Sequence, residues 1–356
     1  MPDGGPAGRR PRVLTLDPQF ADQPDIERAT LGPAPEIVVW RWQGGPPPDD
    51  ALLAEADIVI NCRGRNRLPA PIIERMKRVQ LIVAAGVGFN HIDLDACARR
   101  GIPVCNTPDY GTAEVADHAI ALMLTLVRGT MAYNARLMAG KGGWSTADLP
   151  LRPMRRLRGQ VFGVVGLGRI GLAAALRARA FGMEVAFYDP FLPAGAELST
   201  GFQRHATLPA LLSASDIVSL HCPLSSATTR MMNEAAFAAM RPDAVLVNTA
   251  RGPMVDLDAL HDALQGGRLA AAGLDVLPQE PPDPAHKLLA AWAAGAPWLE
   301  GRLVITPHAA FYTPESLADM RRLSALSAAD FLRDGSLRAC VNPEVARAHQ
   351  AVPSAA

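Results

Sequence analysis

The sequence predicts an α/β protein with two parallel-sheet domains and a cleft between them. Short runs rich in Val, Ile and Leu alternate with longer helical stretches along the 356 residues. These runs are apolar throughout instead of alternating with polar residues, which is typical of strands buried on both faces of a parallel sheet. A glycine-rich turn near the middle divides the series, so two βα-repeating units are expected.

The first unit is expected to hold a sheet followed by a long connecting helix. Its apolar runs cover residues 13–16, 36–40, 57–61, 81–85 and 103–106. Residues 43–50 include three prolines and are expected to form a surface loop. The stretch 114–137 has no proline and is apolar along much of its length, which predicts one continuous helix. The apolar surface of that helix is a candidate homodimer face.

The second unit opens with VFGVVGLGRIG at 161–171, which has the order of a buried strand, a glycine turn and a helix start. Gly166 permits the tight turn, Gly168 lets the backbone approach phosphate groups, and Gly171 lets the helix pack closely on the strand. The helix expected over 170–181 offers unpaired N–H groups and a positive dipole end to a pyrophosphate. We therefore predict a Rossmann-like dinucleotide site here.

Asp189 predicts which dinucleotide binds. It follows the next expected strand, 184–188, at about the 20-residue offset of the ribose-binding carboxylate. A carboxylate there accepts hydrogen bonds from both ribose hydroxyls and repels a 2'-phosphate. The expected cofactor is NAD(H) and not NADP(H).

The remaining strands and helices set the expected domain boundaries. Further strands are expected over 216–221, 244–248, 273–276 and 303–306, and an amphipathic helix over 315–332. The closing Cys340–Pro343 segment is expected to return to the first unit, which makes that domain discontinuous. The boundaries are then 11–110 with 312–345 for the substrate domain and 111–311 for the NAD-binding domain, both Rossmann-like or flavodoxin-like. The termini, 1–10 and 346–356, are rich in Gly, Pro and Ala and are expected to be disordered.

Three ionisable residues at the ends of second-unit strands form a candidate catalytic site: Arg251, Glu280 and His308. Hydride transfer between nicotinamide and a 2-hydroxy acid needs a proton acceptor, a cation for the carboxylate, and a partner that tunes the proton acceptor. His308, Arg251 and Glu280 match these needs in that order. A glutamate beside His308 would favour its protonated form and fix its tautomer.

Composition argues against several other classes of protein. The 35 Lys and Arg residues balance 35 Asp and Glu residues, which gives no overall attraction to nucleic acid or an anionic membrane. The five cysteines are scattered and lack CxxC spacing, so no disulfide framework and no metal site are expected, and a reducing cytoplasm fits best. The longest apolar run, 119–127, is much shorter than the roughly 20 residues that span a bilayer.

These motifs resemble those of the D-2-hydroxyacid dehydrogenases over nearly the whole chain, about 13–342. The resemblance is carried by GLGRIG at 166–171, HCPL at 221–224, NTARG at 248–252, GLDV at 273–276 and TPH at 306–308. Within the family, 306–312 and 337–342 are most similar to the C-terminal binding protein branch. The resemblance implies that Arg251, Glu280 and His308 are catalytic. It also implies contacts with NADH from Arg169, Ile170, His221, Cys222, Pro223, Thr249, Ala250, Arg251, Asp275 and His308.

The resemblance also implies a substrate site. Gly86, Val87 and Gly88 stand where the family binds a substrate carboxylate with backbone N–H groups, a task that suits glycine because it allows close approach. Arg251, His308 and Phe311 are the other substrate candidates. Ala84 and Phe311 stand where the closest branch commonly carries arginine and tryptophan, so the charge and size of the substrate stay open.

The expected function is NAD-dependent interconversion of a small D-2-hydroxy acid and its 2-keto acid. Alternatives are a glyoxylate or hydroxypyruvate reductase, a phosphoglycerate dehydrogenase served by the arginines of 63–67, and an NAD-regulated corepressor-type scaffold. Glu280 counts against a formate dehydrogenase, which carries glutamine there. The segment 286–302 is longer than is usual for the family and is expected to be a lid, an interface or a surface insertion.

Overall fold

The computed structural model describes residues 9–18, 23–42, 45–62, 66–140, 144 and 154–351. By its internal contacts the chain divides into two compact units, residues 1–111 with 313–356, and residues 112–312. The two internal boundaries expected from the sequence, after residues 110 and 311, each lie one residue before the observed ones. Within the surface loop expected at 43–50, residues 45–49 have no regular structure.

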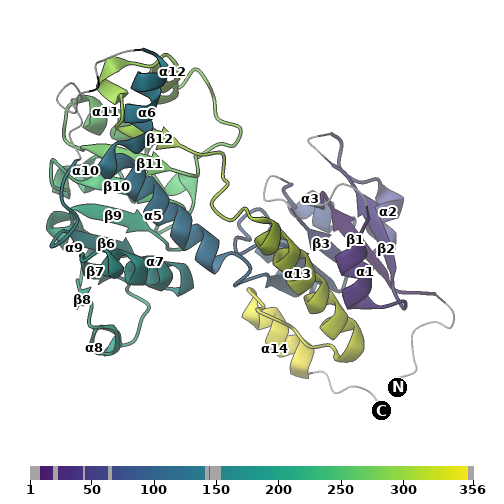
Figure 1. Cartoon of the computed structure of the whole chain (residues 1–356). Helices are drawn as coiled ribbons and strands as arrows, with labels where there is room; N and C mark the ends of the chain where they lie inside the picture. Colours follow the sequence, from purple (N-terminus) through teal and green to yellow (C-terminus); the bar gives the residue numbers. More distant parts are fainter. Residues whose placement is uncertain are drawn as a thin grey trace. The chain divides into compact units, whose positions relative to one another are not determined.

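The first unit is built on a five-stranded parallel sheet in the order β2-β1-β3-β4-β5, of which Figure 1 labels β1, β2 and β3. Its strands are β1 (Arg12–Leu16), β2 (Glu36–Trp40), β3 (Ile58–Asn61), β4 (Leu81–Ala84) and β5 (Val104–Asn106). Its helices are α1 (Asp25–Leu31), α2 (Asp50–Glu55), α3 (Ala70–Ile73), α4 (Leu94–Arg99), α13 (Pro314–Asp334) and α14 (Pro343–Ala351).

This sheet is buried on both faces, which explains the continuously apolar runs. Leu14 and Val59 belong to one buried cluster, whereas their chain neighbours Val13 and Ile58 belong to another. Because successive strand residues point to opposite faces, both faces need apolar side chains. The prediction of a buried parallel sheet is confirmed.

The C-terminal segment returns to this sheet as expected. Helix α13 packs beside α1 (Figure 1), where Arg321 donates to Glu27 at 2.9 Å. Asn342 then accepts a hydrogen bond from the Val104 N–H at 2.8 Å and donates to the Ile102 carbonyl at 3.0 Å. Residues 346–351 continue in α14, so the expectation of disorder is wrong for them, while 352–356 lie outside the described residues.

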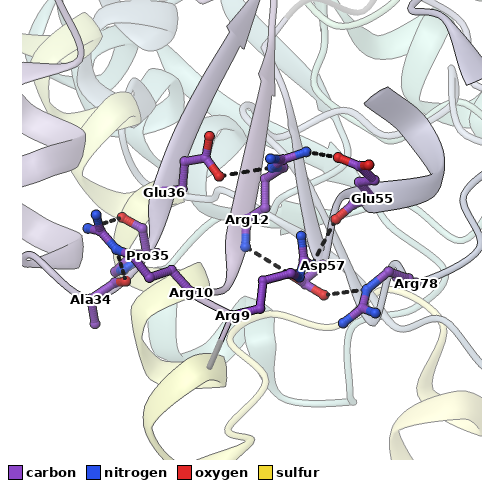
Figure 2. A network of polar contacts seen from close by, with 9 residues as sticks. All are labelled: Arg9, Arg10, Arg12, Ala34, Pro35, Glu36, Glu55, Asp57 and Arg78. Carbon is purple, nitrogen blue, oxygen red and sulfur yellow. Dashed lines mark hydrogen bonds and ion pairs between the residues drawn. The ribbon is translucent and has the colours of Figure 1, made fainter. Parts of the chain in front are cut away.

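The N-terminal edge of β1 is also ordered from Arg9 onward. Asp57 accepts hydrogen bonds from the Arg9 guanidinium at 2.5 Å, the Arg12 N–H at 2.8 Å and the Arg78 guanidinium at 3.3 Å. These residues are drawn in Figure 2. Arg10 donates to the Ala34 carbonyl at 3.0 Å. The carboxylate of Asp57 is largely buried and needs donors, so the expected disorder of 9 and 10 is wrong. Residues 1–8 lie outside the described residues.

The second unit holds a seven-stranded parallel sheet in the order β12-β11-β10-β9-β6-β7-β8 (Figure 1). Its strands are β6 (Val161–Val165), β7 (Glu184–Tyr188), β8 (Gln203–Arg204), β9 (Ile217–Leu220), β10 (Val245–Asn248), β11 (Ala271–Leu274) and β12 (Leu303–Ile305). Its α-helices are α5 (Thr112–Arg128), α6 (Thr130–Met138), α7 (Arg169–Ala180), α8 (Ala196–Thr200), α9 (Leu208–Ala214), α10 (Glu234–Ala239), α11 (Leu257–Gln265) and α12 (Lys287–Ala293). Two 3-10 turns, η1 (Gly252–Met254) and η2 (Pro297–Leu299), complete it.

The expected single helix over 114–137 is in fact two helices. Helices α5 and α6 meet at an angle of 61°. Gly129 lies between them with φ 63°, the left-handed region that ends a helix and favours glycine. In the described parts of the chain no single helix is long and apolar enough to span a bilayer, and α5 with α6 meets that test only as a bent pair.

The segment 286–302 is a packed part of the second unit. Leu288, Leu289 and Leu299 are buried in its core, and Trp298 packs edge-on against His261 of α11 at 5.4 Å. The buried Arg302 guanidinium then donates to the carbonyl oxygens of Leu264, Leu269, Ala270 and Trp298. The longer connection therefore extends the domain core around α11.

Candidate active site

The glycine turn has the geometry that its sequence predicts. Gly166 has φ 89°, and a side chain there would lie 2.8 Å from the backbone of Cys222. A side chain on Gly171 would lie 2.1 Å from the Gly166 carbonyl oxygen, so glycine is required for α7 to approach β6. Gly168, the N-cap of α7, instead faces open space with no atom within 4 Å. The turn is therefore tightly packed at Gly166 and Gly171 and leaves space at Gly168, where a pyrophosphate would fit.

Asp189 lies beside this turn. One carboxylate oxygen accepts from the Leu167 N–H at 3.0 Å, and the other accepts from the Phe191 N–H at 2.9 Å. Arg204 donates to the carbonyl oxygen of Asp189 at 3.0 Å and so braces the loop after β7. The acid therefore sits at the end of β7 next to the phosphate-binding turn, as a ribose ligand requires. The residues present fit a dinucleotide.

His221, Cys222 and Pro223 follow β9 on the other side of the turn. The His221 N–H donates to the Val165 carbonyl at 2.8 Å, and its Nε2 lies 2.8 Å from Ser219 Oγ. Burial lowers the pKa of His221 to about 4, so its ring is neutral at pH 7. Burial also raises the pKa of Cys222 to about 11, which leaves an unreactive thiol packed against Gly166.

Arg251 is positioned by two residues that sequence reasoning missed. Asn248, fully buried at the end of β10, accepts from the Ala250 N–H at 3.0 Å and donates to the Arg251 carbonyl at 3.0 Å. A side chain on Gly252 would lie 1.9 Å from the Leu277 carbonyl carbon. The loop 249–252, with Thr249 and Ala250, therefore packs directly on the loop that carries Glu280. Asn248 and Gly252 are both part of the NTARG motif, but their roles become clear only from the fold.

His308 and Glu280 form a hydrogen-bonded pair. His308 Nδ1 lies 2.7 Å from a Glu280 carboxylate oxygen, whose partner oxygen accepts from the Leu277 N–H at 3.0 Å. Partial burial alone would raise the pKa of Glu280. The pKa is nevertheless lowered, by the hydrogen bond and charge of His308, by the Leu277 N–H and by the charge of Arg251. Glu280 is therefore ionised, and Nδ1 carries the hydrogen that it accepts. The three predicted catalytic residues are brought together.

Asp275 holds the loop that presents His308. Its carboxylate is 1% exposed and accepts from the Thr306 hydroxyl at 2.6 Å, the Ala309 N–H at 2.9 Å and the Ala310 N–H at 3.0 Å. The His308 N–H donates to the Asp275 carbonyl at 2.8 Å. His308 has φ 53°, a costly conformation for a residue with a side chain, which persists because these bonds fix the loop. A contact of Asp275 with the nicotinamide stays a prediction.

An aromatic pair extends this loop. The Phe311 ring meets the His308 ring edge-on at 6.2 Å, and Tyr312 meets Phe311 at 6.4 Å. Phe311 therefore lies next to the candidate proton donor, which agrees with its expected place at the substrate. Within the described residues, no group of three or more His, Cys, Asp and Glu side chains is arranged to hold a metal ion.

The expected carboxylate-binding loop lies in the first unit, after β4. Gly86 has φ 156°, and its carbonyl oxygen accepts from the Thr107 N–H at 2.9 Å. The Val87 carbonyl oxygen accepts from the Asn106 side chain at 2.8 Å. Both carbonyl groups therefore turn toward the end of β5, and the N–H groups of Val87 and Gly88 have no acceptor among the described residues. Two of the three arginines at 63–67, Arg63 and Arg65, lie outside the described residues.

The fold and site define a dinucleotide-dependent dehydrogenase. The comparisons agree: the family model of the D-isomer specific 2-hydroxyacid dehydrogenase, NAD binding domain, matches residues 120–310. A glyoxylate reductase from Korarchaeum cryptofilum is 34% identical over 86% of this chain and 90% of its own length. A hydroxypyruvate reductase from Blautia hydrogenotrophica is 30% identical over 90% of this chain and 97% of its own. The chain belongs to the D-isomer-specific 2-hydroxyacid dehydrogenase family.

Solved structures agree with this assignment. The D-lactate dehydrogenase from Aquifex aeolicus with NAD and lactic acid has a TM-score of 0.76 and 30% identity, covering 94% of this chain and 98% of that one. The NADPH-dependent glyoxylate/hydroxypyruvate reductase from Sinorhizobium meliloti with NADP and malonate has a TM-score of 0.77 and 31% identity, covering 94% and 97%. These relatives are named as enzymes, so the expected closeness to the C-terminal binding proteins and the corepressor-type scaffold are not supported.

Proposed function

We propose that this protein is an NAD(H)-dependent reductase of small 2-keto acids, with glyoxylate and hydroxypyruvate as its first candidate substrates. The observation that carries the proposal is the His308–Glu280 pair at 2.7 Å beside Arg251. The names of the relatives narrow the substrate class, because two of those related over most of this chain are called glyoxylate reductase and hydroxypyruvate reductase.

The cofactor is proposed to bind along the carboxyl edge of the second-unit sheet. Gly166, Gly168 and Gly171 with Arg169 and Ile170 would hold the pyrophosphate, and Asp189 would hold the adenosine ribose. The other proposed contacts are His221, Cys222, Pro223, Thr249, Ala250, Arg251, Asp275 and His308. When bound, the nicotinamide supplies the hydride for reduction of the keto acid and accepts it in the reverse direction.

His308 is the proposed proton donor and acceptor. Its Nδ1–H is held by Glu280, so Nε2 is the atom that exchanges a proton with the substrate oxygen. An ionised Glu280 accepts this hydrogen and so fixes the tautomer and the orientation of the imidazole ring. Arg251 would bind the substrate carboxylate and polarise its carbonyl oxygen. The N–H groups of Val87 and Gly88 are proposed carboxylate ligands, and Phe311 a wall of the substrate site.

The proposal is tested by NADH oxidation with glyoxylate, hydroxypyruvate, pyruvate and longer keto acids. We expect turnover with at least one of them, a loss of at least about 100-fold in kcat for His308→Ala, and a comparable loss in kcat/KM for Arg251→Ala. Arg268→Ala, an exposed arginine on the same domain, is the matched control and should leave the rates unchanged.

The same assay tests the preference for NADH, since Asp189 should make kcat/KM for NADPH lower by at least about tenfold. Tight NADH binding without turnover on any keto acid would contradict the proposed reaction. NADPH used as well as NADH would contradict the role of Asp189.

Two further expectations are part of this proposal. The protein is proposed to be a homodimer, which the exposed apolar side chains of α6 support. It is also proposed to be cytoplasmic, because its five cysteines are all free thiols. Cell fractionation tests the second point, and recovery in a secreted or membrane fraction would contradict it.

A further inference from the structure

Two of the five free cysteines lie directly opposite each other in the first unit. Cys105 is on β5, and Cys340 is in the segment between α13 and α14. They form an isolated antiparallel bridge, although 235 residues separate their numbers. Neither cysteine belongs to the residues proposed to bind substrate or cofactor.

The backbone around the pair brings the two side chains together. The Asn106 N–H donates to the Ala339 carbonyl at 3.2 Å, and the Val341 N–H donates to the Val104 carbonyl at 2.8 Å. These bonds flank Cys105 and Cys340, which makes them a non-hydrogen-bonded antiparallel pair. In such a pair the Cα atoms are about 4.5 Å apart and the side chains lie on one face. That separation is within the range of disulfide bonds, about 4.4–6.8 Å.

The two thiols differ in access and in acidity. Both belong to one apolar cluster with Val83 and Phe331, but Cys105 is fully buried and Cys340 is half-buried. A hydrogen bond from Cys105 outweighs the effect of burial and lowers the pKa of Cys340. The same contact, with burial, raises the pKa of Cys105. Cys340 is therefore the more accessible and the more acidic of the two thiols, and Cys105 is the thiol behind it.

We propose that Cys105 and Cys340 are a reversible redox pair that a hydroperoxide converts into a disulfide. The Cys340 thiolate attacks a peroxide oxygen, the O–O bond breaks, and a sulfenic acid and hydroxide form. The Cys105 sulfur then attacks the Cys340 sulfur, the S–O bond breaks, and water leaves. With hydrogen peroxide, two thiols lose two electrons and two protons, and the peroxide becomes two water molecules. An external dithiol reverses the reaction by thiol–disulfide exchange.

The pair adjoins the residues that shape the loop at 86–88. Asn106 and Thr107 follow Cys105 and hold the carbonyl groups of Val87 and Gly86. A covalent bond between Cys105 and Cys340 constrains the end of β5 where these hydrogen bonds originate. We therefore expect oxidation to change the KM for the keto acid more than the affinity for NADH. This consequence rests on the proposed function, whereas the disulfide itself does not.

The test uses the full-length protein, hydrogen peroxide, alkylation of the remaining thiols and peptide mass mapping. We expect one intramolecular link between the peptides of Cys105 and Cys340, two fewer alkylated thiols, and recovery with dithiothreitol. Cys340→Ser should abolish the link. The matched control is Cys97→Ser, at a buried position where burial raises the thiol pKa to about 12, and it should leave the link intact. Before oxidation, Cys340 should be alkylated at pH 7 on the order of tenfold faster than Cys97.

The outcomes separate this proposal from the proposed reaction. Oxidised wild-type protein without a link between Cys105 and Cys340, or a Cys340 that reacts no faster than Cys97, would overturn the redox pair. Alkylation of the unmodified wild type needs no variant, so a folding defect in Cys340→Ser does not obscure the result. If the link forms but no keto acid is reduced, the proposed reaction fails and the redox pair stands. If the link forms and KM does not change, the coupling to the loop is wrong.

Discussion

The charge of Glu280 decides how the proposed proton donor behaves. Its carboxylate accepts from His308 Nδ1 and from the Leu277 N–H, and it lies close enough to Arg251 for that charge to lower its pKa. Because the folded pKa is lowered, the contribution of this pair to stability is present above the ordinary pKa of glutamate, about 4.3, and is lost as the pH falls through the lowered value. At neutral pH the carboxylate is charged throughout.

Glu280→Gln keeps the shape of the side chain and removes this charge. We expect kcat for keto-acid reduction to fall by about tenfold or more, because His308 loses the anionic acceptor that holds its Nδ1–H. Steady-state rates at pH 7 measure the effect. An unchanged kcat would mean that the charge of Glu280 has no part in the reaction. Arg268→Ala again serves as the control.

The candidate catalytic residues could be proposed from sequence, but the residues that position them could not. Arg251, Glu280 and His308 each have an ordinary structural explanation when taken alone, and it is the three together, in their motifs, that indicate catalysis. Asn248 holds the backbone of its own loop, and Gly252 lets that loop pack on the backbone of Leu277, a neighbour that is known only from the fold. Asp275 was expected at the nicotinamide, and its bonds to the His308 loop depend on β11 and β12 being adjacent.

At the scale of elements, buried parallel strands were predicted within one or two residues because they are continuously apolar. The errors have local causes. Gly129 ends α5 by adopting a left-handed conformation, which a single glycine in an apolar pattern does not reveal. The strand β8 has two residues and leaves no periodic signal. Helix α14 was hidden by a Pro- and Ala-rich end, although Asn342 ties its start to β5.

The glycine turn gives a prediction at this scale, because its glycines have different surroundings. Gly168→Ala meets open space at φ −74°, so the free energy of unfolding should change by less than about 0.5 kcal/mol, while NADH should bind about tenfold more weakly. Gly171→Ala overlaps the Gly166 carbonyl and should cost about 1–3 kcal/mol of stability. Denaturant unfolding without cofactor and NADH titration measure the two effects. Equal destabilisation by both variants would contradict a turn that is open at Gly168.

At the scale of the whole molecule, the two units hold residues with different proposed roles. The matched family model lies within the second unit, where the candidate catalytic and cofactor residues are gathered. The first unit holds the loop at 86–88 and the cysteine pair. We therefore expect residues of this unit to determine the choice of substrate and the response to oxidation. The substrate therefore follows less directly from sequence than the reaction.

The proposed dimer is the prediction that belongs to the whole molecule. Met131 is 58% exposed and Met138 is 81% exposed on α6, seven residues apart and hence on one face. The Arg136–Glu300 ion pair at 2.7 Å fixes α6 on its own unit, which presents this apolar face as a preformed surface. Sedimentation should give a species of twice 37.8 kDa. Met131→Glu with Met138→Glu should shift it to the monomer, because two desolvated carboxylates oppose a buried interface. Arg268→Ala should stay dimeric, and a wild type that sediments as a monomer would rule out the dimer.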